Sequence, residues 1–213
     1  MALATAMVAG AMGCGNGDGG GVRGSGTSAS EAREVESFTK VESDGAADIV
    51  VSIGEPQSVM VETDDNLLAL LETDVRGDTL RIRFRDRVRS TAGLDVAITV
   101  PALEDVTING AADVEIEGAS GGNLGFTING AASIYATGKV DRVDVDINGA
   151  GDVQLFELVA ETVDISISGN GDVEVHATRS LSARLSGSGQ VVYDGDPAEV
   201  DTSVTGSGSI ERR

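Results

Sequence analysis

The string TINGAA occurs twice in this chain, starting at Thr107 and again at Thr127. Looser copies follow as DINGAG, SISGNG, RLSGSG and SVTGSG, so that a glycine returns every 18 to 20 residues. The first glycines of the six copies are Gly110, Gly130, Gly149, Gly169, Gly187 and Gly206. A period of this size, sustained through half the chain, is typical of proteins built from stacked supersecondary units.

Apolar and polar residues alternate on both sides of these glycines. Val143, Val145 and Ile147 lead into one copy, and Val153 and Leu155 leave it. A period of two is typical of strands with one buried face. Two such strands in about 19 residues cannot bury a face alone, but stacked at the ~4.8 Å spacing of paired strands they can. The repeat therefore predicts an all-β solenoid, or β-helix, with parallel strands in two or three sheets and rungs of about 19 residues.

The glycine of each copy and the residue before it have predicted structural roles. Glycine supplies the φ > 0 conformations that let the chain bend sharply between sheets. Three of the six glycines follow an asparagine, and in register these side chains would stack into an amide ladder worth about 1 kcal/mol net per bond. The asparagines of the predicted ladder are Asn109, Asn129 and Asn148.

Charge and composition exclude several classes of function. A formal net charge of −20 argues against nucleic-acid binding, because a phosphate backbone is bound by Lys and Arg side chains that neutralise it. The chain has no Trp, 2 Tyr and 4 Phe, so its core must be thin and built from β-branched residues. One Cys excludes a disulfide within the chain. We predict no cofactor and no bound metal.

The N-terminal segment resembles the end of a lipoprotein signal. The residues AMG before Cys14 fit a lipobox, after which the cysteine becomes the lipidated N-terminus, although a positively charged region before it is missing. We interpret residues 1–14 as the remnant of a signal whose true start lies upstream, and residues 15–36, rich in Gly and Ser, as a flexible tether. Gly15, in place of an Asp that retains lipoproteins at the inner membrane, favours the outer membrane. The alternative is a disordered apolar N-terminus whose cysteine has no function.

Residues 37–213 are predicted to form one domain. Residues 103–213 hold the regular repeats, and residues 37–102 are interpreted as the irregular opening rungs and cap of the same solenoid. SDGAADIV, from Ser43, matches the turn motif in this first part. Within it, DDNLLALLET is expected to form a short helix or a bulging loop.

An arginine row is the sharpest local anomaly. In RIRFRDRVR every second residue is arginine, and residues 76–89 carry a net charge of +4 inside a strongly acidic chain. The row is expected on one face of a strand, either as a solvated edge that pairs with nearby carboxylates or as a binding stripe for an anion or partner. Its members are Arg81, Arg83, Arg85, Arg87 and Arg89.

Other patterns give weaker indications of chemistry. Asp113, Asp152 and Asp172 recur after the turns and could bind Ca²⁺, but the copies between and after them carry Ser or Gln there, which favours polar capping. His176 is the single histidine and has no fixed nucleophile partner. A polysaccharide-acting enzyme would need a cleft built by long loops, whereas the links here span about four to seven residues. We therefore predict no catalytic residue.

Three segments in order along the chain resemble the head GIN domain family of auto-transporter adhesins. They are FTKVESDGAADIVVSI, then VAITVPALEDVTINGAADVEI, and then serial turns such as SGNGDV and SGSGQV. The resemblance implies a right-handed parallel β-helix, export behind a secretion or lipoprotein signal, and adhesion without an assigned enzymatic activity.

Together these features predict a non-enzymatic lipoprotein of the cell envelope that binds a protein or glycan partner. The charged C-terminal edge of the last rung is expected to engage a partner or a second copy, giving a homo-oligomer. Two alternatives stay open: a periplasmic sensor or scaffold, and a β-helix enzyme acting on polysaccharides.

Overall fold

The computed structural model describes residues 21–213, and the signal, Cys14 and residues 15–20 of the tether lie outside this part. The described chain is all-β, with one short 3-10 turn, η1 (Leu68–Leu70). Thirteen strands form one sheet, and β1 and β8 form a separate small one. The strands, in chain order, are β1 (Val22–Arg23), β2 (Ser28–Arg33), β3 (Lys40–Asp44), β4 (Ala46–Ile53), β5 (Ser58–Asp64), β6 (Leu71–Arg76), β7 (Thr79–Phe84), β8 (Val88–Arg89), β9 (Leu94–Val100), β10 (Asp105–Ile108), β11 (Ala111–Ile128), β12 (Ala131–Ile147), β13 (Ala150–Asp194), β14 (Glu199–Gly206) and β15 (Ser209–Arg212).

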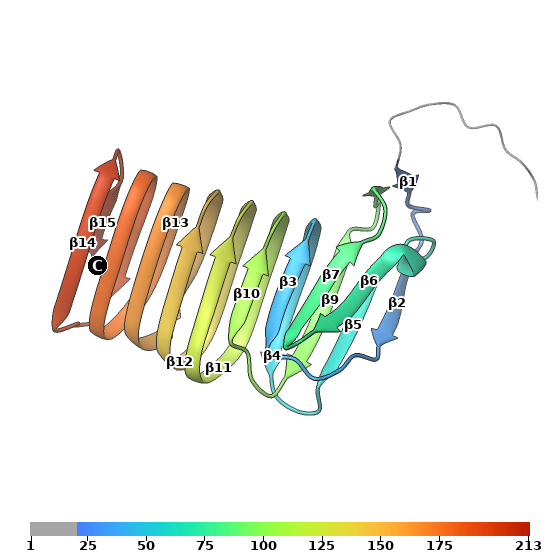
Figure 1. Ribbon diagram of the computed structural model, residues 1–213, viewed down its shortest axis with the longest axis horizontal. Coiled ribbons are helices and arrows are strands. Elements are labelled where there is room, and N and C mark those ends of the chain that lie inside the picture. The colour runs from blue at the N-terminus through green and yellow to red at the C-terminus, as the bar shows by residue number, and fades with distance from the viewer. Residues whose placement is uncertain (1–20) are drawn as a thin grey trace, which may run out of the picture.

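From β10 to β15 the chain winds so that the paired segments run in parallel and lie 19 or 20 residues apart in the sequence. Ala111 of β11 is opposite Ala131 of β12, and Ala131 is opposite Ala150 of β13. β11, β12 and β13 are long because each bends from one side of the winding to the next without losing its pairing (Figure 1). The links between the strands of successive copies take part in the ladder as well, as at Ala119 opposite Gly138.

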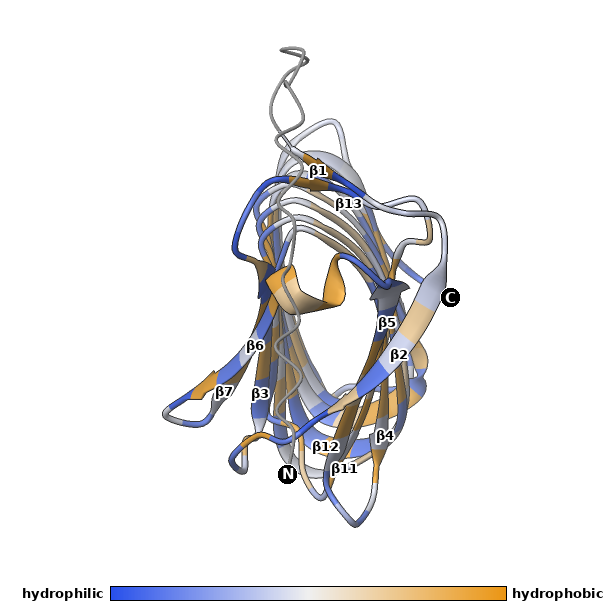
Figure 2. Cartoon of the chain, turned by 90° about the vertical axis from the view of Figure 1, so that its right-hand side faces the viewer, coloured by the Kyte–Doolittle hydropathy of each residue, from blue (hydrophilic) through white to orange (hydrophobic). Residues whose placement is uncertain are grey.

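The core lies between two walls of the wound sheet that face each other (Figure 2). Inward side chains stack in register from one winding to the next, so that Val106 is opposite Phe126, Phe126 opposite Val145 and Val145 opposite Ile165. All four are at most 2% exposed. The alternation of the sequence therefore becomes continuous apolar columns, and each winding buries its neighbour's inner face.

A column of glycines marks one edge of the windings. We call each winding a layer and name it by the glycine of its turn. A Cβ placed on Gly130 would lie 1.9 Å from the carbonyl oxygen of Gly110, and one on Gly149 would lie 2.0 Å from that of Gly130. Neither Gly130 nor Gly149 has a positive φ, whereas Gly187 and Gly206 have φ of 144° and 132°. The predicted need for positive φ was therefore wrong for Gly110, Gly130 and Gly149, where close approach of stacked backbones excludes a side chain.

The order of layers in space differs from the order in the chain. β3 and β4, which form the Gly45 layer, lie between the Gly110 layer and an opening layer made of β7 and β9. After β1 and β2, the chain thus enters the stack in the second layer at β3, builds the end of the stack, and then passes back to continue at β10. β2, β5 and β6 add antiparallel strands at this end.

The opening at that end is covered by apolar residues of η1 and its flanks. Leu67 and Leu71, on either side of η1, are 0% and 3% exposed, and the turn lies across the mouth of the stack (Figure 2). The segment DDNLLALLET therefore contains a short 3-10 turn followed by the start of β6.

The N-terminal strands correct the predicted tether. β2 lies within residues 15–36 and pairs antiparallel with β5. Ser28 and Ser30 donate hydrogen bonds to Glu62, so polar side chains hold this strand where an apolar pattern is absent.

Asp64, at the end of β5, ties this N-terminal segment to the loop before β9. Its carboxylate is 0% exposed and accepts hydrogen bonds from Ser90 Oγ at 2.5 Å, Gly26 N at 2.6 Å and Thr91 N at 2.8 Å. The Ser90 hydroxyl and the backbone N–H groups hold the pKa of Asp64 well below its usual range, against the opposing effect of burial.

Replacing Asp64 with Asn is expected to lower the stability of the folded chain at neutral pH. Because the folded pKa lies below the unfolded value of about 3.9, the ionised carboxylate stabilises the fold above that value. That stabilisation is lost as the pH falls through the folded pKa. Urea midpoints measured from neutral pH down to about pH 2 should therefore converge for the wild type and Asp64→Asn. Asp141→Asn, which removes an exposed charge, is the matched control, and a gap for Asp64→Asn that widens in acid contradicts the assignment.

Candidate binding surfaces

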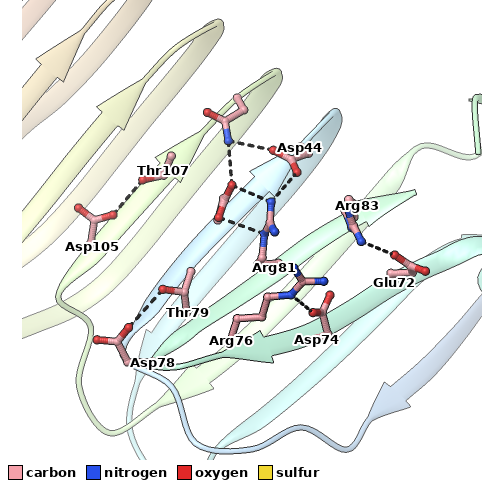
Figure 3. A network of polar contacts seen from close by, with 12 residues as sticks. Asp44, Glu72, Asp74, Arg76, Asp78, Thr79, Arg81, Arg83, Asp105 and Thr107 are labelled. Atoms are coloured by element: carbon pink, nitrogen blue, oxygen red, sulfur yellow. Dashed lines mark hydrogen bonds and ion pairs between the residues drawn. The ribbon is translucent and has the colours of Figure 1, made fainter. Parts of the chain in front are cut away.

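The outer face of the β6–β7–β3 wall carries alternating charges. β7 lies between β6 and β3, with Arg83 opposite Glu72 and Arg81 opposite Glu42. Arg81 Nε is 3.2 Å from Glu42, and Arg83 Nη2 is 2.9 Å from Glu72 (Figure 3). Arg85 Nε also reaches Glu72, at 2.9 Å. The first three arginines of the row therefore have carboxylate partners within the chain.

The row is divided between two strands, which corrects the prediction of one arginine face. β7 ends at Phe84, and the chain bends before β8, where Arg89 is opposite Arg23 of β1. The backbone oxygens of Arg87 and Arg89 accept hydrogen bonds from Val22 and Gly24. The strand ends at Phe84 because the following residues leave the main sheet and pair with β1 as β8. β1 is distant in sequence, so the local alternation of residues does not reveal this pairing.

Two arginines compensate the charge of Glu72. The guanidinium of Arg85, which donates to Glu72, and the nearby charge of Arg83 lower the pKa of this carboxyl below its usual range, while burial opposes them. Arg85 itself is 62% exposed, against 24% for Arg81. An external anion would therefore meet Arg85 more readily than Arg81.

Asparagine side chains continue this outer face along the stack. Asn129 Nδ2 donates to Asn109 Oδ1 at 2.9 Å, and Asn148 Nδ2 donates to Asn129 Oδ1 at 3.1 Å. Asn109 Nδ2 in turn donates to Asp44 at 2.8 Å and to Glu42 at 3.1 Å. The amides thus join the arginine-paired carboxylates of the Gly45 layer to three further layers, those of Gly110, Gly130 and Gly149.

The opposite wall carries a column of carboxylates. Glu62, Asp95, Asp48 and Asp113 are opposite one another on four successive strands. Burial raises the pKa of Asp95, with further contributions from the charges of Asp48 and then Glu62. This wall is therefore strongly acidic near the Gly45 layer.

Farther along this wall the acidic residues are spaced apart. Ser133 separates Asp113 from Asp152, and Asp172 Oδ1 accepts a hydrogen bond from Gln190 N at 2.9 Å. Within residues 21–213 no group of three or more Asp, Glu, His or Cys side chains is arranged to hold a metal ion.

A half-enclosed cavity of about 530 Å³ lies at the start of the glycine column. It is bounded by the turn of the Gly45 layer on one side and by residues 84–94 of the opening layer on the other. Its lining includes Phe84, Asp86, Val88 and Leu94. The sequence pattern does not indicate this site, because the alternation in residues 81–89 points only to an arginine row.

Comparison with known proteins identifies the family. The model of the family described as "Putative auto-transporter adhesin, head GIN domain" matches residues 37–197. The chain belongs to this family. No curated protein matches the chain.

Solved structures agree with the head GIN assignment. A crystal structure of a putative adhesin from Bacteroides fragilis is 25% identical, with a TM-score of 0.69, and the match covers 91% of this chain and 100% of that one. A putative adhesin from Parabacteroides merdae is 18% identical with a TM-score of 0.55 over 90% of this chain and 98% of that one, and it shows the fold alone.

The described surface of this head GIN domain offers two charged walls, stacked turns and, among its hollows, the cavity beside the Gly45 turn. No helix within residues 21–213 is long and apolar enough to span a membrane. The walls can present hydrogen-bond donors and carboxylates at the regular spacing of paired strands, which suits contact with an extended partner.

Proposed function

We propose that the protein is a non-enzymatic adhesin or binding protein of the cell envelope. The observation that carries this proposal is the head GIN family match together with the similarity to the B. fragilis putative adhesin over nearly the whole chain. The partner is a protein or a glycan that contacts the long outer walls of the stack. A periplasmic sensor or scaffold with the same fold is the alternative.

The fold and the anchor form part of this proposal. The parallel pairing at 19 or 20 residues supports a right-handed parallel β-helix with rungs of about 19 residues over residues 37–213. Lipidation of Cys14, followed by residues 15–20 as the remaining tether, would hold this domain at the outer membrane. At the far end of the stack, β14 pairs only with β13 within the described chain, and Val200 and Val204 are 46% and 42% exposed. A second copy at this edge would form the proposed homo-oligomer.

The proposal is tested by binding of the purified full chain to arrays of glycans and of envelope proteins. We expect saturable binding to at least one class. A variant with Arg85→Gln and Arg87→Gln tests whether the exposed arginines take part. Their neutralisation should weaken the binding of an anionic partner and leave the binding of a neutral partner unaffected.

Protease treatment of intact source cells should release peptides of this protein if the domain faces outward. Release of none from cells that make the protein would favour the periplasmic alternative.

A further inference from the structure

The cavity exists because the glycine column has no predecessor at its first turn. A Cβ on Gly110 would lie 1.9 Å from the oxygen of Gly45, whereas one on Gly45 would have no heavy atom within 4 Å. The opening layer has no glycine turn to stack on Gly45. Its chain leaves β7 at Phe84, runs outward to form β8, and returns only at Leu94. The space that a turn fills in later layers is therefore open.

The strand edge beside this space is unpaired over a short stretch. β3 pairs with β7 as far as Asp44, and β4 pairs with β9 from Asp48 onward. Within the described chain, Ala46 and Ala47 have ladder partners only on the Gly110 side. The cavity thus lies against backbone that elsewhere in the column is covered by the next layer.

The lining combines an apolar floor with carboxylates. Phe84, Val88 and Leu94 supply the apolar surface, and Leu94 is 6% exposed. Three carboxylates, a serine and small turn residues complete the lining, which contains no Lys, Arg or His. These remaining residues are Asp44, Asp48, Asp86, Ser90, Gly45, Ala46, Ala47 and Gly93.

Of the three carboxylates in the lining, Asp44 has an arginine as its ion-pair partner. Asp44 lies 3.5 Å from Arg81 Nη2 and accepts from Asn109. Among the described residues, no ion pair reaches Asp48 or Asp86, and the neighbours of Asp48 on the wall are Asp95 and Asp113. A bound group therefore meets two further carboxylates that no ion pair neutralises within residues 21–213, although the charge of Arg85 lies near enough to Asp86 to interact with it.

We propose that this cavity binds an organic cation: an ammonium or guanidinium group carried on an apolar stem. The charge excludes anions, and a volume of about 530 Å³ lies within the usual range of small-molecule pockets. The carboxylates are not grouped for a metal ion, whereas a larger cation with several N–H donors can span them. The stem would lie on Val88 and Leu94, and Phe84, which also lines the cavity, would supply an aromatic face for a cation–π contact. This assignment goes beyond the proposed function and does not depend on adhesion.

The test uses hexylammonium as the probe with the full ¹⁵N-labelled chain. Amide shifts at Ala46, Ala47, Ser90 and Gly93 should change and saturate, with an affinity on the order of 1 mM, as expected for a small ligand. 1-Hexanol, which keeps the stem, and hexanoate, which reverses the charge, should bind at least about tenfold more weakly. Nα-acetyl-lysine methylamide distinguishes a peptide side chain from a free amine as the source of the cation.

Matched variants locate the site. Asp48→Asn and Asp86→Asn should each weaken hexylammonium binding about 3- to 10-fold, and Asp141→Asn, which removes an exposed carboxylate outside the lining, should leave it unchanged. Equal binding of 1-hexanol and hexylammonium, equal loss in all three variants, or shifts elsewhere in the chain would each overturn the proposal. None of these outcomes bears on whether the long walls bind an adhesion partner.

Discussion

Replacing Gly130 with alanine is expected to destabilise the folded chain by about 3 kcal/mol or more, because overpacking and displaced ladder hydrogen bonds act together. The new Cβ would lie 1.9 Å from the oxygen of Gly110, closer than any real contact. That oxygen also accepts the hydrogen bond of Ala131 N at 2.8 Å, so the two layers must separate at this point. Urea unfolding of the full chain, followed by circular dichroism, measures the loss.

Gly54→Ala is the matched control for this prediction. Gly54 also lies outside the set with positive φ, and the nearest atom to an added Cβ is Thr99 Cγ2 at 3.7 Å, an ordinary contact. The same chemical change should therefore alter stability by less than about 1 kcal/mol in either direction. If the two variants lose stability equally, close approach of the glycine backbones is not what requires glycine in the column.

The repeat made much of the stack predictable. A strand has a side-chain period of two, and the glycines recur every 18 to 20 residues, so the sequence places residues such as Val145 inward and Asn129 beside the turn. The structure has Val145 in the core and Asn129 bonded to Asn109. Patterns of this kind are informative because each layer contacts mainly its neighbours, which have nearly the same sequence.

The end of the stack was not predictable, because pairing between distant segments determines it. Nothing local indicates that β7 precedes β3 in space, or that the polar residues of β2 form a strand. The arginine row shows the same limit, since its alternation continues past Phe84 while the strand does not. The cavity beside Asp86 depends on that break and could not be found from residue patterns.

Truncating Phe126 to alanine is expected to cost about 3–5 kcal/mol, as for other large-to-small changes at buried aromatic residues. Its ring is 1% exposed and stacks in register between Val106 and Val145. Thin cores of this kind have few neighbours that can move inward to fill the gap, so most of the cavity should remain. The free energy of unfolding from urea titration of the full chain gives the measured loss.

Phe156→Ala is the matched control. It removes the same side-chain atoms at a half-buried site, and so it distinguishes the loss of core packing from the mere loss of a phenyl ring. The centroid of the Phe156 ring lies 4.9 Å from the guanidinium carbon of Arg213, so truncation of Phe156 should remove mainly this contact and cost about 1 kcal/mol or less.

The location of Phe126 should also determine which strands open in the Phe126→Ala variant, because in a linear stack a weakened interface in the middle uncouples the layers on either side. Hydrogen exchange should then show faster opening of β10 to β12 in Phe126→Ala while β5 and β9 keep their protection. Equal losses in the two variants, or uniform loss of protection along the whole chain, would show that the layers are not coupled mainly through their nearest neighbours.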